Sequence, residues 1–157
     1  MKKLLILSLL VFTSVCFAQI ESFDSTYINE LKQDVWGTYR EIVEDNLTLT
    51  EDQATIFWPL CDAYIADLGK IFEKRVEIIS NYMMNYYAMD DATAKDLLNK
   101  SIQSEQEILN TRRDYINKML EKLPAPLVGK FFQVDVRVTA LANLVRMSSV
   151  PLVREEE

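Results

Sequence analysis

The stretch LTLTEDQATIFWP, residues 47–59, marks the start of a long helix and decides how the rest of the chain divides. Thr50 and Gln53 stand three residues apart, so the Thr50 hydroxyl can accept a hydrogen bond from the Gln53 amide while the Gln53 side chain reaches back to the Thr50 amide. Glu51 and Asp52 fall in the first turn, where carboxylates meet the positive end of the helix dipole. This pattern predicts a capping box with Thr50 as the N-cap.

Pro59 lies inside the helix that this cap begins. Its ring clashes with the carbonyl of Thr55 and removes one helical hydrogen bond. We therefore expect a bend in the helix at this point.

Apolar residues recur at helical spacing over most of the chain, which contains only three Gly and four Pro for the turns that many short strands would need. The spacing predicts an all-α fold of four helices. The expected ranges are about 24–45, about 50–87, about 90 to Pro124, and a fourth helix that has Pro126 in its first turn and frays before Pro151.

Residues 1–18 are typical of an export signal. Two lysines precede an apolar run at residues 4–15, and the small residues Cys16 and Ala18 suit cleavage before Gln19. The run is shorter than the roughly 20 residues that a membrane-spanning helix needs. We expect a cleaved signal peptide and an exported, periplasmic protein with no membrane insertion afterwards. Lipid anchoring through Cys16 is the alternative, although the residues before it lack the preferred lipoprotein pattern.

The residues after the signal suffice for one domain with its own core and are too few for two ordinary ones. We expect a single helical domain over residues 19–153 and a disordered acidic tail at 154–157. The 17 Lys and Arg residues face 24 Asp and Glu residues, giving a formal net charge of −7 and of −9 once the two signal lysines are removed. This sign repels phosphate backbones and argues against nucleic acid as a partner.

Enzyme chemistry finds little support in the composition. The chain has no His, which removes the Ser-His and Cys-His arrangements and the histidine ligands of helical-bundle metal sites. We expect no catalytic residue, no metal and no cofactor. Cys61, the one thiol left after cleavage, is expected to be buried, with a disulfide to another chain as the alternative. Asp90 and Asp91 lack the spaced oxygens of a calcium loop and more simply cap the third helix.

The stretch SNYMMNYYAM, residues 80–89, carries more apolar side chains than one helix face can bury. The candidate protein-binding residues here are Tyr82, Met83, Tyr86, Tyr87 and Met89. Met and Tyr form adaptable apolar surface, which suits binding of protein clients or a dimer contact. The alternative is a helix end that its own neighbours bury.

Six basic residues on the predicted second and third helices are candidates for a local basic face. They are Lys70, Lys74, Arg75, Arg112, Arg113 and Lys118. The alternative is that they are ordinary solvated charges that pair with Glu73, Glu77 and Asp114, since exposed charge is the norm.

The letters LTEDQ at residues 49–53 resemble the LTxxQ motif of the Spy/CpxP-like family of exported helical proteins. The motif residues are Leu49, Thr50 and Gln53. As in that family, they follow an export signal and a first helix. The family's second copy would fall after the third helix, where the letters LPAPL at residues 123–127 keep only the leading Leu.

Two further features accompany this resemblance. Phe57 and Phe131 each lie eight residues after a leading Leu, which indicates a decayed internal repeat. The FWP and PLV stretches are similar to those of small exported helical proteins that some bacteria encode as stress sensors of sigma-factor systems.

The resemblance implies an elongated, bent four-helix hairpin that pairs into a cradle-like homodimer. It also implies a function: an ATP-independent chaperone of unfolded clients or, alternatively, a sensory or regulatory partner in an envelope-stress or sigma-factor system. One departure is the overall acidic charge, since the best known chaperone of the family presents a basic concave face. We therefore expect a protein that binds other proteins and catalyses no reaction.

Overall fold

The computed structural model describes residues 38–148 and 150–153. Their elements are a helical segment at residues 38–46, α2 (Glu51–Asn85), α3 (Asp91–Leu120) and α4 (Ala125–Ser148). No strand occurs within these ranges, which confirms the predicted all-α, four-helix class. The signal peptide, the start of the first predicted helix and the acidic tail lie outside the described residues.

The capping box at the start of α2 is confirmed. Thr50 has an extended backbone, and its hydroxyl accepts a hydrogen bond from the Gln53 amide at 3.3 Å. The Thr50 amide donates in return to Gln53 Oε1 at 3.0 Å. Leu49, just before the cap, is half-buried and packs against the core. The family-like motif is therefore also a complete helix start.

Replacing Thr50 with Ala is expected to lower the free energy of unfolding by about 1 kcal/mol without changing the fold, because one amide of the first turn loses its acceptor. Chemical denaturation followed by circular dichroism measures the change. Thr48→Ala is the matched control, because Thr48 is exposed and precedes the helix. Equal denaturation midpoints for the Thr50 variant and the parent would show that the cap contributes nothing.

The other helix ends follow from similar local chemistry. Asp90 caps α3 as predicted, accepting a hydrogen bond from the Thr93 amide at 2.7 Å, and this bond lowers the pKa of the Asp90 carboxyl. α2 continues through Pro59 and ends at Asn85, about two residues before the predicted end. The chain then turns through residues 86–90 into α3.

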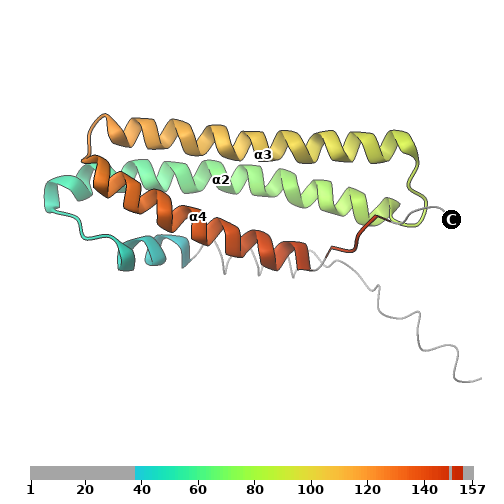
Figure 1. The fold of residues 1–157 in the computed structure, drawn as a ribbon, viewed down its shortest axis with the longest axis horizontal. Coiled ribbons are helices and arrows are strands. Elements are labelled where there is room, and N and C mark those ends of the chain that lie inside the picture. Colours follow the sequence, from blue (N-terminus) through green and yellow to red (C-terminus); the bar gives the residue numbers. More distant parts are fainter. Residues whose placement is uncertain (1–37, 149, 154–157) are drawn as a thin grey trace, which may run out of the picture.

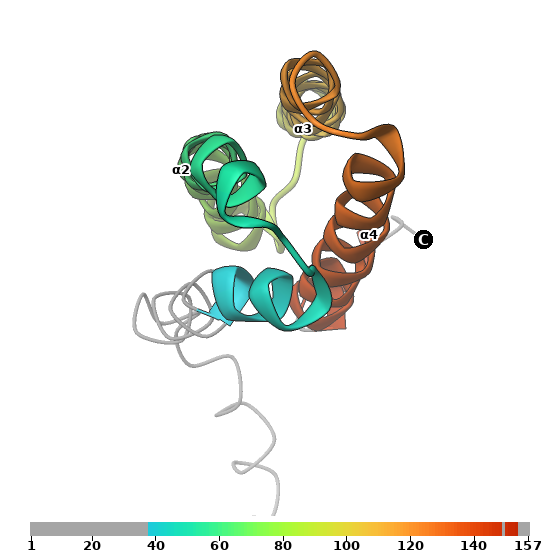
Figure 2. The same ribbon diagram turned by 90° about the vertical axis from the view of Figure 1, so that its left-hand side faces the viewer.

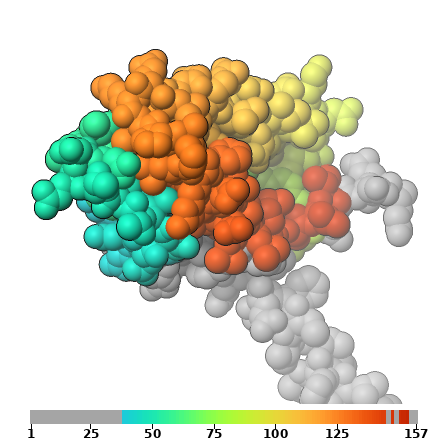
Figure 3. Space-filling model, turned by 60° about the vertical axis from the view of Figure 1, so that its left-hand side comes forward, coloured from blue at the N-terminus to red at the C-terminus, as the bar shows by residue number. Residues whose placement is uncertain are grey.

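The helices surround one interior, but they do not close it equally along their length. α3 lies alongside α2, whereas α4 starts beside the end of α3 and then runs obliquely away from it (Figure 1). Figure 2, turned by 90°, shows α2, α3, α4 and the segment at residues 38–46 around a common centre. In the space-filling view of Figure 3, the surface of α2 is visible between α3 and the red end of α4. The bundle is therefore open on the side between α3 and α4.

The core lies near the start of α2 and the junction of α3 with α4. Phe57 and Phe131, the pair that suggested a repeat, meet edge to face with their ring centroids 5.3 Å apart. Cys61 is fully buried, as predicted, and burial raises the pKa of its thiol to about 12. Further from this core, large apolar side chains become exposed.

Candidate functional site

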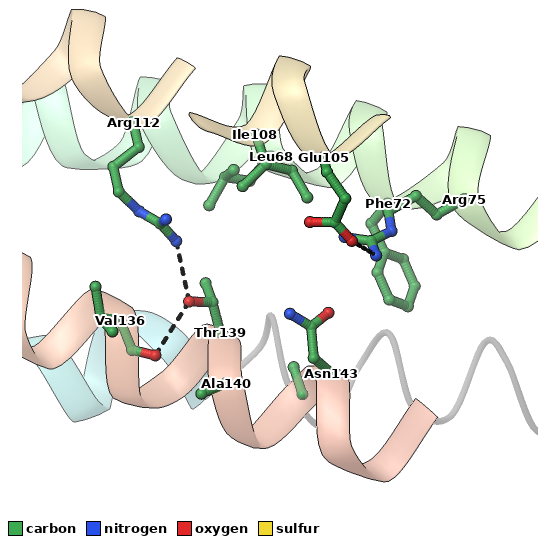
Figure 4. Close-up of a pocket in the computed structure, with 11 residues that line it drawn as sticks. Leu68, Phe72, Arg75, Glu105, Ile108, Arg112, Val136, Thr139, Ala140 and Asn143 are labelled. Atoms are coloured by element: carbon green, nitrogen blue, oxygen red, sulfur yellow. Dashed lines mark hydrogen bonds and ion pairs between the residues drawn. The ribbon is translucent and has the colours of Figure 1, made fainter. Parts of the chain in front are cut away.

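Two adjoining cavities lie between α2, α3 and α4. The first has a volume of about 240 Å³ and is drawn in Figure 4. The second, of about 380 Å³, continues toward the far ends of α2 and α3. Arg75 of α2 and Glu105 of α3 line both cavities and form an ion pair where the two meet. We call the two cavities together the groove.

The first cavity has an apolar floor and a polar inner end. Leu68 and Phe72 come from α2, and Ile108 comes from α3 (Figure 4). At the inner end, an Arg112 guanidinium nitrogen donates a hydrogen bond to the Thr139 hydroxyl at 3.0 Å. The charged groups that reach this cavity are thus already paired with protein partners.

The second cavity is mostly apolar, and Ser101, Ser104 and the Arg75–Glu105 pair are among its polar lining residues. Its wall on α2 includes Ile78 and Ile79, and its wall on α3 includes Leu97 and Leu98. Residues 150–153, which follow α4, line the remaining side. At about 380 Å³ it falls within the usual size range of ligand-binding cavities.

Apolar side chains that line the groove are also open to solvent. Leu98 of α3 is 61% exposed, and Met147 and Val136 of α4 are 56% and 38% exposed. Ile102 and Leu109, at 60% and 53%, follow Leu98 at helical spacing along the same side of α3. Ile102 and Leu109 line neither cavity, so among the described side chains the large exposed apolar lining on α3 and α4 consists of Leu98, Val136 and Met147. Single exposed apolar residues are common, but several near one groove make it a candidate interaction surface.

A buried polar network fixes the inner end of the groove. Asp135 of α4 is only 1% exposed, and its Oδ1 accepts hydrogen bonds from the hydroxyls of Tyr39 at 2.7 Å and Tyr64 at 2.9 Å. Its Oδ2 accepts a charged hydrogen bond from Nε of Arg112 at 2.5 Å. The Thr139 hydroxyl donates to the Asp135 carbonyl at 2.8 Å. Each of the four helical segments contributes a side chain, so the network fixes the positions of the four segments relative to one another.

Raising the pH above about 10 is expected to destabilise this network. Burial, together with the Asp135 carboxylate, raises the pKa values of Tyr39 and Tyr64 above the ordinary tyrosine value. Folding thus favours the neutral hydroxyls. This stabilisation is complete below about pH 10 and is lost as the pH rises toward the folded pKa values, since tyrosines of the unfolded chain ionise first.

Denaturant titrations at about pH 9 and pH 11 measure this loss. A Tyr39→Phe, Tyr64→Phe double variant, which cannot ionise at these two positions, should lose less stability over the same interval. Equal losses in the variant and the parent would show that these two hydroxyls do not govern the alkaline response.

The six predicted basic residues do not form one exposed face. Arg75 is buried and pairs with Glu105, and Arg112 points inward to Asp135. The other four lie on the surface: Lys70 pairs with Asp67 at 2.8 Å, Lys74 pairs with Glu107 at 2.8 Å, Arg113 donates to Asn110 at 3.1 Å, and the Lys118 amine lies 4.3 Å from the centre of the Tyr115 ring. The acidic partners Asp67, Glu107, Glu105 and Asp135 were not among the predicted ones.

The Tyr and Met cluster at residues 82–89 is divided between the groove and the outer surface. Tyr82 and Met89 line the second cavity. Tyr86 makes edge-to-face contacts with Tyr82 and Tyr87, at centroid distances of 5.8 and 5.1 Å. Met83 and Tyr86 are half-buried and Tyr87 is 66% exposed, so the helix end is not buried by its own neighbours. Met84, which was not among the predicted residues, is 75% exposed.

No described helix is long and apolar enough to cross a membrane. Within the described ranges, no three potential metal ligands come together.

No protein-family model, curated protein or solved structure matches this chain. The likeness to the Spy/CpxP-like family therefore rests on residues of this sequence alone, chiefly the LTEDQ stretch.

Proposed function

We propose that this protein is an exported, periplasmic chaperone that holds apolar segments of unfolded proteins in the groove without using ATP. The observation that carries the proposal is that three large apolar side chains of α3 and α4, Leu98, Val136 and Met147, both line the groove and are exposed to solvent. Unfolded proteins expose apolar segments that such a surface can cover, because burial of apolar area drives association.

The polar groups of the groove support broad rather than selective binding. Sites for specific small molecules carry a few polar groups placed to fix the orientation of the ligand. Here Arg75 is paired with Glu105, and Arg112 is paired with Asp135, so neither arginine offers a free charge to a ligand. Met147 and Met89 add flexible side chains that can adapt to different apolar partners.

The buried network around Asp135 supports a preformed groove. Because the network links all four helical segments, the inner walls of the groove are already ordered before a client binds. Less conformational entropy is therefore lost on binding. The exposed Met84 and Tyr87 lie outside the groove lining and offer a contact for the proposed homodimer.

The test is an aggregation assay with two unrelated proteins that unfold on heating. We expect near-stoichiometric amounts of the mature protein to suppress the light scattering of both clients in the absence of nucleotide, whereas an unrelated acidic helical protein should not. Failure with both clients would overturn the chaperone proposal. It would favour the alternative, a regulatory partner of one specific protein, for which selective capture of a single stress sensor would be the expected finding.

A further inference from the structure

The chain holds a segment of its own against the second cavity. Residues 150–153, with the sequence Val-Pro-Leu-Val, follow α4 and line the cavity together with Met89 and Leu98. The Tyr82 hydroxyl of α2 donates a hydrogen bond to the carbonyl oxygen of Pro151 at 2.8 Å. We call residues 150–153 the strap.

The strap covers the cavity without filling it. Val150 is half-buried, but Leu152 and Val153 are 89% and 61% exposed, and about 380 Å³ of cavity remains. The strap is also joined to α2 by a single side-chain hydrogen bond near the surface, a kind of bond that adds little net stability. Apolar side chains therefore remain uncovered both on the strap and in the cavity.

The local chemistry of the strap indicates what conformation the cavity accepts. The Val150 amide still donates to the Met147 carbonyl at 3.3 Å, so the strap leaves α4 through a bend, and residues 151–153 have no regular secondary structure. The ring of Pro151 fixes its φ angle, removes a backbone donor and favours an extended backbone from Pro151 onward. The cavity walls are helices, whose backbone groups are already paired within the helix, so a bound segment cannot add as a strand. Recognition then depends on apolar side chains and on the Tyr82 hydroxyl.

We propose that the second cavity binds an extended, proline-containing apolar segment of a partner protein, with the Tyr82 hydroxyl donating to a backbone carbonyl, and that the strap is a displaceable competitor for this position. The proposal rests on the proposed function in taking the groove as a protein-binding site. To the proposed function it adds two points: the bound segment is extended, and the strap regulates access to the second cavity.

The expected size of the competition follows from the strap's own attachment. A site that is open for only a fraction of the time binds with an affinity reduced by that fraction. The Val150 amide bond to Met147 is local to the end of α4, so one neutral hydrogen bond to Tyr82 and a few apolar contacts hold the strap across the cavity. Releasing it should therefore raise the affinity roughly two- to tenfold.

The test uses the full-length mature chain and a fluorescent peptide with the sequence of residues 147–153. Fluorescence anisotropy compares the parent with a strap variant that carries Pro151→Gly, Leu152→Ser and Val153→Ser. We expect the strap variant to bind the peptide roughly two- to tenfold more tightly. Adding Tyr82→Phe should then weaken binding by a similar factor, because the donor to the peptide carbonyl is removed. Circular dichroism checks that helix content is unchanged.

Leu141→Ser is the matched control, because Leu141 is 63% exposed on α4 and lines neither cavity. It should bind the peptide as the parent does. The proposal is overturned if no variant binds the peptide, if the strap variant binds no more tightly than the parent, or if Tyr82→Phe has no effect. Suppressed aggregation without peptide binding would reject the strap proposal alone, whereas strap-dependent peptide binding without suppression would reject the chaperone proposal alone.

Discussion

Replacing Asp135 with Ala is expected to lower the free energy of unfolding by about 3 to 5 kcal/mol. Asp135 is 1% exposed and accepts hydrogen bonds from Tyr39, Tyr64 and Arg112. Its removal leaves a largely buried guanidinium without its carboxylate and two buried hydroxyls without their acceptor, and such orphaned groups keep the full cost of desolvation. Chemical denaturation measures the loss of stability.

Two variants sharpen this prediction. Asp114→Ala removes an exposed carboxylate on α3 and should change the stability by less than about 0.5 kcal/mol. Replacing the whole network by apolar groups, with Arg112→Met and Asp135→Leu added to Tyr39→Phe and Tyr64→Phe, should recover most of the lost stability, because no buried polar partner is then left unpaired. A small effect of Asp135→Ala, matching that of Asp114→Ala, would mean that the network does not hold the helices together.

Placing negative charge in the groove should weaken binding of unfolded clients at least tenfold. The proposed variant combines Leu98→Asp on α3 with Val136→Asp on α4, which line the second and first cavities. Burial of one apolar side chain at an interface stabilises a complex by roughly 1 to 3 kcal/mol, and about 1.4 kcal/mol corresponds to a factor of ten in affinity. Titration of a permanently unfolded, labelled client measures this change, while circular dichroism checks the fold.

The matched control carries Leu141→Asp with Leu144→Asp. Both residues are exposed on α4, at 63% and 67%, and neither lines the groove. This control makes the same chemical change at the same number of positions and should retain the affinity of the parent. If both double variants bind clients equally weakly, client binding does not depend on the groove in particular but on apolar residues over the surface in general.

The features that the sequence predicts well are the local ones. Thr50 and Gln53 bond to each other across three residues, and Asp90 bonds to the nearby Thr93 amide, so these helix starts depend little on the rest of the fold. Cys61 was expected to be buried because it stands among apolar residues at helical spacing, and it is.

The sequence-based expectations do not include the buried network, because exposure is the norm for charged side chains. Asp135 follows Phe131 by four residues and precedes Val138 by three, so helical spacing alone places it on the buried face of α4. Arg112 likewise follows Ile108 and precedes Tyr115 on α3. An acidic and a basic residue on the apolar stripes of two helices were therefore a usable signal for a buried pair.

The groove could not be predicted in the same way. It exists because α4 runs away from α3 beyond their junction, and the crossing angle of two helices depends on packing along their whole length. Of the predicted members of the cluster at residues 82–89, Tyr87 is exposed and Tyr82 and Met89 line the groove, while protein binding by this cluster stays a prediction. Which side of α3 and α4 stays uncovered follows from the three-dimensional arrangement alone.

Site-specific photo-cross-linking tests the central claim, that clients bind in the groove, most directly. A photoreactive phenylalanine derivative is placed either at Leu98, which lines the second cavity, or at Leu141, which lines neither; the two positions have nearly equal exposures of 61% and 63%. With an unfolded client present, the groove account predicts strong cross-linking from position 98 and little from position 141. Equal yields at the two positions, or a higher yield at 141, would contradict it.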